Sequence, residues 1–371
     1  MPPKHKIALL TILLATCWGI GFKPGGDLNV YHQAAQWIAS GKTDHIYRDN
    51  AQIGNFFYGP IAFTLLRPFG ELQIETMNWI WLGLQTVAFL FFWIGLTRLF
   101  PTAWFLLAWV SSIKPIHASF QSHNVQLMFA AILVWAEIGS RQSNKIKQAA
   151  AGAVVVLLTA IKIYPGFIAL YYLLRRPNPV RYGLLIGTAL AALIPILTFG
   201  PRLGAYLPFE FVKTALTYHH VYDLGLDTVS LSLPSLLARW APQLWLDYEL
   251  IPIVVGIIAA LFFVRRPAPE PRNWALALAL MGLLNSTTRP DYFIFFVPAF
   301  CALSELRNSI STKVGIAISL LLIAFITEWT LQSRDLSHRL ESWRVPVLGI
   351  MLLCSLLWFQ SVSENLKRIK N

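Results

Sequence analysis

The segment from Glu75 to Leu99 reads ETMNWIWLGLQTVAFLFFWIGLTRL and decides the class of fold. It is apolar for longer than the roughly 20 residues that a helix needs to cross the hydrocarbon core of a bilayer. Further candidate spans recur along the chain at 7–24, 182–200, 249–264, 273–289, 291–306, 314–330 and 345–362. The sequence therefore predicts an all-α, polytopic transmembrane protein.

The composition of the whole chain supports this class. Of 371 residues, 56% are hydrophobic and 13% are charged, with 14 Trp and 24 Phe; the mean hydropathy is +0.55. A soluble domain carries about 25% charged residues. The composition therefore excludes an ordinary cytosolic enzyme, a disordered chain and a nucleic-acid-binding module, and no nucleic acid is expected as a partner.

Two further pairs of apolar runs are short and interrupted. They cover 102–116 with 124–139, broken at Lys114-Pro115 and His123-Asn124, and 149–161 with 164–174, broken at Lys162 and Pro165. Short, broken helices usually line a cavity, because free backbone groups cannot face lipid. We expect two hairpins that enter from the cytoplasmic side, with Lys114 and Lys162 near their apices, and about 12 helical segments in all.

Basic residues predict the orientation, because cytoplasmic loops carry an excess of Lys and Arg. One face of the predicted topology receives 17 of the 30 basic residues but only four of the 18 acidic ones. Both termini are therefore expected in the cytoplasm, with the protein in the inner (cytoplasmic) membrane of the cell. Segments 25–74, 201–248 and 331–344 become the long external loops of a single domain, residues 1–371.

The first apolar run follows the basic residues 4–6, which is the charge order of a secretory signal. Many apolar segments follow it, so we expect an uncleaved first helix. Cys17, Cys301 and Cys354 all lie in apolar segments and form neither a disulfide framework nor a metal-binding spacing. We interpret them as packing residues.

The first external loop opens with Gly25-Gly26-Asp27 and continues with an amphipathic pattern. The apolar residues follow the i, i+3, i+7 spacing of one helix face: Leu28, Tyr31, Ala35 and Ile38. This pattern predicts a helix on the outer membrane surface that starts near Asp27. By spacing alone Asp27 is an N-cap, because Asp is among the residues preferred there. A catalytic role can coexist with that one.

Longer stretches resemble a known family. They are Gly-Asp-Leu-Asn-Val-Tyr-His-Gln-Ala-Ala at 26–35, Gly41, Tyr47, and Phe-Tyr-Gly-Pro-Ile-Ala-Phe-Thr-Leu-Leu-Arg-Pro-Phe at 57–69. Ser-His-Asn-Val-Gln at 122–126 and Thr-Ala-Ile-Lys-Ile-Tyr-Pro at 159–165 are similar to its Gly-Gln-x-Asn and Lys-x-x-Pro segments. The chain resembles glycosyltransferase family 87, which comprises integral membrane enzymes of the GT-C fold. The resemblance implies a polyprenyl-phosphate sugar as donor, with mannose or a related sugar transferred.

Two segments depart from the pattern of that family. Its usual Tyr-Pro-Pro is Tyr58-Gly59-Pro60 here. Its late external segment, which contains a histidine, is Ser-Thr-Thr-Arg-Pro-Asp-Tyr at 286–292. Neither departure touches the expected base, and both bear on the identity of the sugar and the acceptor.

The resemblance aligns Asp27 with the acidic residue that GT-C enzymes place in the first external loop, and so implies that it is the catalytic base. Sugar transfer from a lipid phosphate needs a base near the acceptor hydroxyl and positive charge near the departing phosphate. Cations at or near the same face are Lys114, Lys162, Arg239 and Arg289. Because the spaced carboxylates of a divalent-metal site are missing, we expect an inverting transfer without a cofactor and leave metal use open.

Each cation also has a structural interpretation. Lys114 and Lys162 can snorkel from helix ends to water, and Arg289 can pair with Asp291 across Pro290. Lys162 is the stronger phosphate ligand, because an ionisable residue that interrupts an apolar run within a membrane is a functional candidate by default.

Further residues of these segments are expected to contact substrate. They are Tyr31, Tyr58, His123, Asn124, His219, His220 and Asp291. The cluster at 218–223 also permits a metal site, but adjacent histidines on a surface loop are more often solvated than ligating. The expected partners are therefore a polyprenyl-phosphate sugar donor, a glycolipid or glycan acceptor, and the lipid bilayer.

Two other classes of protein fit part of the pattern. A transporter or flippase of a lipid-linked saccharide also needs broken helices and a cationic cavity. Against it, this chain has no duplicated halves, and its external loops are long and carry acidic residues. A non-catalytic scaffold of envelope glycan assembly would keep the fold without the chemistry. Exchange of Asp27 separates these classes, because only an enzyme needs its basicity.

Overall fold

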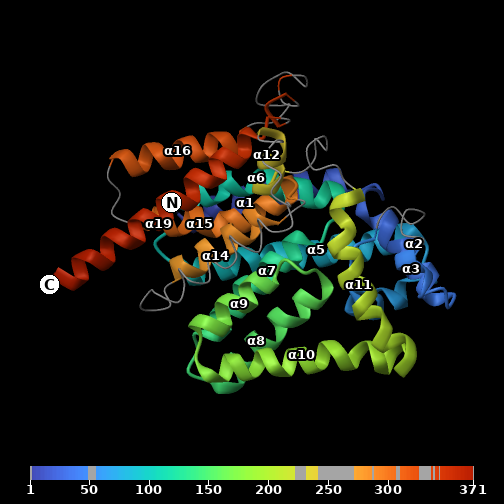
Figure 1. The fold of residues 1–371 in the computed structure, drawn as a ribbon. Coiled ribbons are helices and arrows are strands. Elements are labelled where there is room, and N and C mark those ends of the chain that lie inside the picture. Colours follow the sequence, from blue (N-terminus) through green and yellow to red (C-terminus); the bar gives the residue numbers. More distant parts are fainter. Residues whose placement is uncertain are drawn as a thin grey trace. The chain divides into compact units, whose positions relative to one another are not determined.

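The computed structural model describes residues 2–48, 56–221, 231–240, 271–285, 288–305, 310–325, 336, 339–341 and 343–370, with side chains except at 215–221, 237–240 and 360–370. Within these ranges the regular secondary structure is helical throughout, without a strand, which confirms the all-α class (Figure 1). The first helices are α1 (Pro3–Gly21), α2 (Asp27–Ala39), α3 (His45–Arg48), α4 (Pro60–Leu66), η2 (Arg67–Phe69), α5 (Ile74–Leu99), α6 (Phe105–Ser122), α7 (Gln126–Ser140), α8 (Lys145–Ile161) and α9 (Gly166–Arg175). They are followed by α10 (Asn178–Phe199), α11 (Pro201–Val221), α12 (Leu233–Trp240), α14 (Pro271–Leu284), η3 (Pro290–Phe296), α15 (Val297–Ser304), α16 (Ile310–Ala324) and α19 (Val345–Lys370).

The chain divides into two compact units. Unit 1 consists of Met1–Thr11, Leu96–Ile116 and Tyr222–Asn371, and unit 2 consists of Ile12–Gly95 and His117–Val221. In unit 1, α14 and α16 both pack against α19, and α15 packs against α14. The expectation of a single membrane domain stays a prediction.

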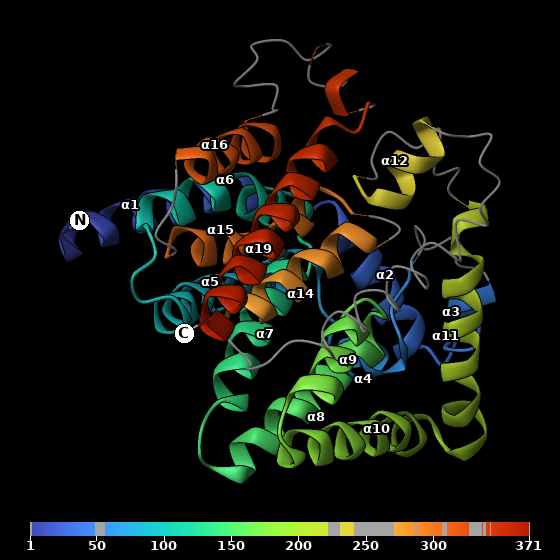
Figure 2. The same ribbon diagram turned by 60° about the vertical axis from the view of Figure 1, so that its left-hand side comes forward.

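In unit 2, α8 packs against α7, α9 and α10, and Figure 2 shows these four green helices together. Small residues allow α8 and α10 to approach closely. A Cβ added to Gly152 would lie 2.1 Å from the Val180 carbonyl oxygen, and one added to Gly183 would lie 1.9 Å from that of Ala149. Membrane helices commonly associate through such small residues, because little hydrophobic force acts between helices in lipid.

The amphipathic helix of the first loop is α2, as predicted, but its apolar face has a different partner. Its apolar residues are buried in a core of unit 2 that includes Phe56, Tyr58, Phe63 and Trp81. The face expected to lie on the membrane surface is therefore covered by protein. The first part of the predicted 201–248 loop is the helix α11, whose Leu207 and Phe211 join the same core.

Two described helices are long and apolar enough to cross a membrane, α5 and α10. They coincide with the predicted spans 75–99 and 182–200. Only 22% of the most apolar window of α10 is buried inside the protein, and the side chains of Leu185 and Leu197 are 68% and 78% exposed. A core helix of a soluble protein would be covered, so this exposure fits a helix that faces lipid. The run 249–264 lies outside the described residues, and the number and orientation of the spans stay predictions.

The helix breaks predicted at Lys162 and at His123-Asn124 are confirmed, and the break predicted at Lys114-Pro115 is wrong. Entry of the two hairpins from the cytoplasmic side stays a prediction. The chain leaves the helix at Lys162 and resumes it at Gly166, as predicted. In contrast, α6 continues through Lys114-Pro115 and ends at Ser122, so Lys114 lies within a helix and not at an apex. Proline is tolerated inside membrane helices, because Ser and Thr side chains and neighbouring groups satisfy the freed backbone.

Labelling of single cysteines tests the orientation. With the external side assigned to residues 25–74, a cysteine at Lys42 should react with an impermeant thiol reagent in intact cells, whereas one at Ser143 should react only after permeabilisation. Both positions are exposed, whereas Thr43, at 3% exposure, would be a poor labelling site. The native cysteines are buried and should give little background. Labelling of Ser143→Cys in intact cells would refute the topology.

Candidate active site

Asp27 begins α2 at a tightly packed turn. The N-cap position is taken by Gly26, which has a φ of 53° and makes no side-chain cap. A Cβ at Gly26 would lie 2.6 Å from the Ser122 carbonyl oxygen, so the turn between α1 and α2 is pressed against the end of α6. The interpretation of Asp27 as the N-cap is therefore wrong. Its carboxylate still lies in the first helical turn, where the helix dipole favours negative charge.

The Asp27 carboxylate is held through one of its two oxygens. Asn124 Nδ2 donates to Asp27 Oδ2 at 2.6 Å, and the Tyr31 hydroxyl donates to the same atom at 3.3 Å. No described residue donates to Asp27 Oδ1. The side chain of Asp27 is half-buried. The described structure thus fixes the orientation of the carboxylate and leaves one oxygen available to accept a proton.

The turn between α6 and α7 presents Asn124 to Asp27. Asn124 is 3% exposed, and Gln85 Nε2 of α5 donates to two carbonyl oxygens of this turn, Ser119 at 2.8 Å and Asn124 at 3.3 Å. His123 has a φ of 55°, and its Nε2 donates to the Gly21 carbonyl at 3.1 Å. Burial lowers the pKa of the His123 imidazole, an effect that the nearby Asp27 carboxylate partly opposes. We expect the ring to be neutral at pH 7 and to connect the end of α1 to the turn through its hydrogen bond to Gly21.

A pair of tyrosines connects Asp27 to Lys162. The Tyr31 and Tyr58 hydroxyl oxygens are 2.5 Å apart. Because the single proton of Tyr31 is donated to Asp27, the Tyr58 hydroxyl is the donor between them. Lys162 Nζ lies 4.4 Å from the centre of the Tyr58 ring, which is within the range of a cation–π contact. The structure therefore brings the predicted base and one predicted phosphate ligand to the two ends of one short chain of contacts.

Gly59 explains one departure from the family pattern. Its N–H donates to the Ile161 carbonyl at 2.8 Å, and a Cβ would lie 1.9 Å from the Ala160 carbonyl oxygen. A proline here would remove this donor and add atoms where the two backbones touch. The contact fastens the start of α4, and with it Tyr58, to the end of α8, where Lys162 follows. A close approach of backbones therefore requires the glycine in Tyr58-Gly59-Pro60.

Lys162 lies in the extended segment between α8 and α9, with φ −140° and ψ 136°. Its side chain is half-buried. The Tyr164 hydroxyl donates to Gln126 Oε1, which ties this segment to the first residue of α7. The Asn124 and Lys162 segments, which are separate motifs in the sequence, are thereby joined in unit 2.

The remaining predicted site residues fall outside this group. Lys114 belongs to unit 1, where its Nζ lies 3.3 Å from Glu341 Oε1 and 5.6 Å from the centre of the Phe293 ring. Lys114 thus already has a protein counter-ion. Arg289 takes the N-cap position of η3 in unit 1, and Asp291 in its first turn is 3% exposed. The side chains of His219, His220 and Arg239 lie outside the described residues.

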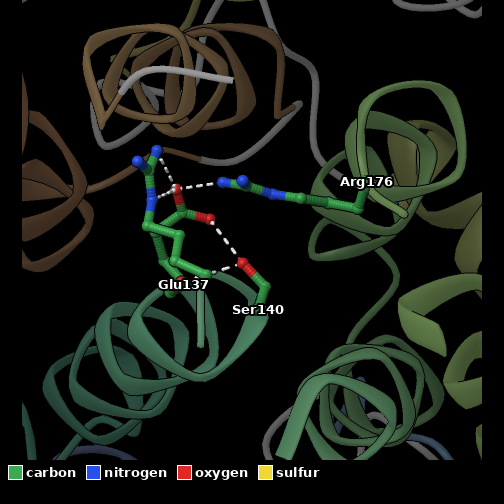
Figure 3. A network of polar contacts seen from close by, with 4 residues as sticks. Glu137, Ser140 and Arg176 are labelled. Carbon is green, nitrogen blue, oxygen red and sulfur yellow. Dashed lines mark hydrogen bonds and ion pairs between the residues drawn. The ribbon is translucent and has the colours of Figure 1, made fainter. Parts of the chain in front are cut away.

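A buried charge network lies in unit 2, and sequence reasoning missed it. Figure 3 shows Arg176, the residue that follows α9, reaching toward Glu137, while Ser140 approaches from the same helix as Glu137. Arg176 Nη2 and Arg141 Nε both donate to Glu137 Oε1, the latter at 2.7 Å. The Glu137 side chain is fully buried and that of Arg176 is 2% exposed. The sequence signal for this network is Glu137 itself, a single acidic residue within the apolar run 124–139.

Gln85 is a second residue that sequence reasoning missed. It is a fully buried amide in the apolar helix α5, and it holds the turn that carries Asn124. Among the described residues, no group of three or more His, Cys, Asp or Glu side chains is arranged to hold a metal ion. The cluster at 218–223 lies outside the described side chains, so metal use stays open.

The exposed apolar helix α10 and the half-buried carboxylate of Asp27, held by Asn124 and Tyr31 within unit 2, fit a helical membrane protein with a polar site. The family model of glycosyltransferase family 87 matches residues 56–287, more than half of the chain. The chain belongs to glycosyltransferase family 87 and is therefore a membrane glycosyltransferase. No curated protein and no solved structure matches it. Tyr58, Asn124 and Lys162 lie within the matched residues, whereas Asp27 and Tyr31 precede them.

Proposed function

We propose that the protein transfers mannose or a related sugar from a polyprenyl-phosphate donor to a hydroxyl of a lipid or glycan acceptor. The reaction takes place on the external face and inverts the anomeric configuration. The observation that carries the proposal is the connection of Asp27, through Tyr31 and Tyr58, to Lys162 within unit 2. Family membership supports the reaction class, and the predicted orientation supports the face.

The two ends of this chain suit the two demands of the reaction. The acceptor oxygen attacks the anomeric carbon, and the bond from that carbon to the phosphate oxygen breaks. Asp27 Oδ1 takes the acceptor proton as general base. The leaving prenyl phosphate keeps the electron pair, and the Lys162 ammonium stabilises its charge. A single displacement of this kind inverts the anomeric centre and needs no covalent enzyme intermediate.

The tyrosines have a supporting role in this proposal. A cation–π contact with the Tyr58 ring orients the Lys162 ammonium without neutralising its charge. The hydroxyls of Tyr31 and Tyr58 separate the carboxylate from the ammonium. Direct pairing of Asp27 with Lys162 would weaken both, since a paired carboxylate is a poorer base and a paired ammonium a poorer anion ligand. Arg289 remains a proposed second phosphate ligand.

Exchange of Lys162 tests the donor end of the proposal. In nanodiscs, wild-type protein should convert a polyprenyl-phosphate mannose and an extract of glycolipid acceptors into prenyl phosphate and a glycosylated product. Lys162→Met should weaken donor binding and slow turnover. Folding should be preserved, because the Met side chain can fill the space that the apolar methylene groups of Lys162 occupy. Lys162→Arg should restore only part of the donor binding and turnover, since a planar guanidinium group does not replace a compact ammonium.

The matched control is Lys145→Met, an exposed lysine at the start of α8. If Lys162→Met keeps the donor affinity and turnover of the wild type, Lys162 does not bind the donor phosphate and only extends its ammonium toward water. Movement of the donor across the bilayer without cleavage of its phosphate bond would favour a flippase. A product with retained anomeric configuration would refute the single displacement.

A further inference from the structure

We infer that Asn124 is a positioning residue that holds Asp27 Oδ2 so that Asp27 Oδ1 faces the acceptor hydroxyl. This inference rests on the proposed function of Asp27 as the base. The sequence predicts that Asn124 contacts substrate, whereas here its partner is the Asp27 carboxylate. The amide acts on the reaction through the carboxylate and does not itself touch the sugar.

The hydrogen bonds of Asp27 are unequal and converge on one oxygen. The bond from Asn124 measures 2.6 Å and that from Tyr31 measures 3.3 Å. Tyr31 lies on α2 itself, so it moves with Asp27, whereas Asn124 comes from the turn between α6 and α7. Asn124 is therefore the tether that relates the carboxylate to the rest of unit 2. With Oδ2 held, rotation of the carboxylate is restricted and Oδ1 keeps a constant direction.

The chemistry of the amide defines which way it faces. A carboxylate only accepts hydrogen bonds, so the Asn124 NH₂ group, and not its carbonyl, must point toward Asp27. The Asn124 Oδ1 atom is buried and has no hydrogen-bond partner among the described residues. An unsatisfied buried carbonyl is unfavourable for folding. The side chain is thus arranged for its contact with Asp27 and not for the stability of the turn.

The turn that carries Asn124 is held from three sides. Gln85 donates to the carbonyls of Ser119 and Asn124, His123 donates to the carbonyl of Gly21, and Gly26 packs on Ser122. These ties use backbone groups or other side chains, so they persist when the Asn124 amide is removed. Removal of the amide should therefore release the carboxylate without releasing the turn.

A neutral donor suits a base better than a charged one. An ammonium or guanidinium at position 124 would orient Asp27 but would also stabilise its ionised form and reduce its basicity. An aspartate at position 124 would have the same shape as Asn and could donate only while it carries a proton. Two adjacent carboxylates share a proton and titrate as a pair. The Asn124→Asp variant therefore converts the tether into one that depends on pH.

The test compares Asn124→Ala, Asn124→Asp and Asp27→Asn in nanodiscs, each with kcat, KM and a pH profile. We expect kcat of Asn124→Ala to fall by about 100-fold, the size of effect that a misplaced reacting group produces, with a much smaller change in the KM for acceptor. We expect Asn124→Asp to retain part of the activity at low pH and to lose it as pH rises, when the shared proton leaves and the tether becomes a repulsion.

A double variant separates this inference from the proposed function. In an Asp27→Asn background, Asn124→Ala should cause no further loss, because residues that act through one another are not additive. Gln148→Ala is the matched control, since the Gln148 amide donates to the Gln142 carbonyl at 2.6 Å in the same unit and should not affect kcat.

Two outcomes overturn the inference. One is an unchanged kcat in Asn124→Ala, or a change in KM alone, which would make Asn124 a substrate contact. The other is a loss in Asn124→Asp that does not vary with pH, which would indicate a purely structural role. If Asp27→Asn itself keeps near-normal activity, the proposed base is wrong whatever Asn124 does.

Discussion

Replacement of Asp27 by Asn should lower sugar transfer by about 100- to 10,000-fold, the range typical for loss of a general base. The substitution keeps the shape of the side chain. Its amide oxygen can still accept hydrogen bonds from Asn124 and Tyr31, so the turn between α1 and α2 should keep its structure. What disappears is the basicity of the atom that faces the acceptor hydroxyl.

The measurement is turnover of a polyprenyl-phosphate sugar by purified protein, with thermal unfolding as the check on folding. Asp44→Asn is the matched control, because Asp44 belongs to the same predicted external loop and its carboxylate lies 3.9 to 4.0 Å from His45 and Arg48 at a 41%-exposed position. That variant should retain activity. Near-normal transfer by Asp27→Asn, or an equal loss in Asp44→Asn, would show that the carboxylate of Asp27 is not the base.

Replacement of Glu137 by Leu should destabilise unit 2 by about 3 to 5 kcal/mol, because removal of one partner leaves the other as an uncompensated buried charge. The side chain of Arg176 is 2% exposed, whereas that of Arg141 is 25% exposed and can turn outward. The cost therefore arises mainly at Arg176. Destabilisation should appear as a lower unfolding temperature in detergent.

The double variant Glu137→Leu/Arg176→Met should recover much of the lost stability, because apolar residues of similar volume often replace a buried ion pair at little cost. Arg141→Met alone should have a smaller effect than Arg176→Met, in line with its exposure. If Glu137→Leu unfolds at the wild-type temperature, the network in Figure 3 does not stabilise the unit.

Sequence reasoning predicted the elements of the site better than their connections. The helix at 27–39, the break at Lys162 and the candidate base follow from local spacing and from the family resemblance. The break at Pro115 was predicted wrongly, because proline ends helices in water more strictly than in membranes, where other groups satisfy the freed carbonyl. The N-cap was also assigned wrongly. The left-handed φ of Gly26 and its contact with Ser122 place the helix start one residue earlier than the pattern of polar residues indicates.

The sequence by itself determined the helical class, the apolar helices α5 and α10, and the family, because these depend on runs of neighbouring residues whose transfer to lipid adds up along one segment. Only the tertiary structure decided which polar groups meet. Asp27 and Asn124 are 97 positions apart, and Glu137 and Arg176 are 39 apart. Buried polar groups must find partners wherever the packing of helices places them, and no local pattern states which distant turn will supply one.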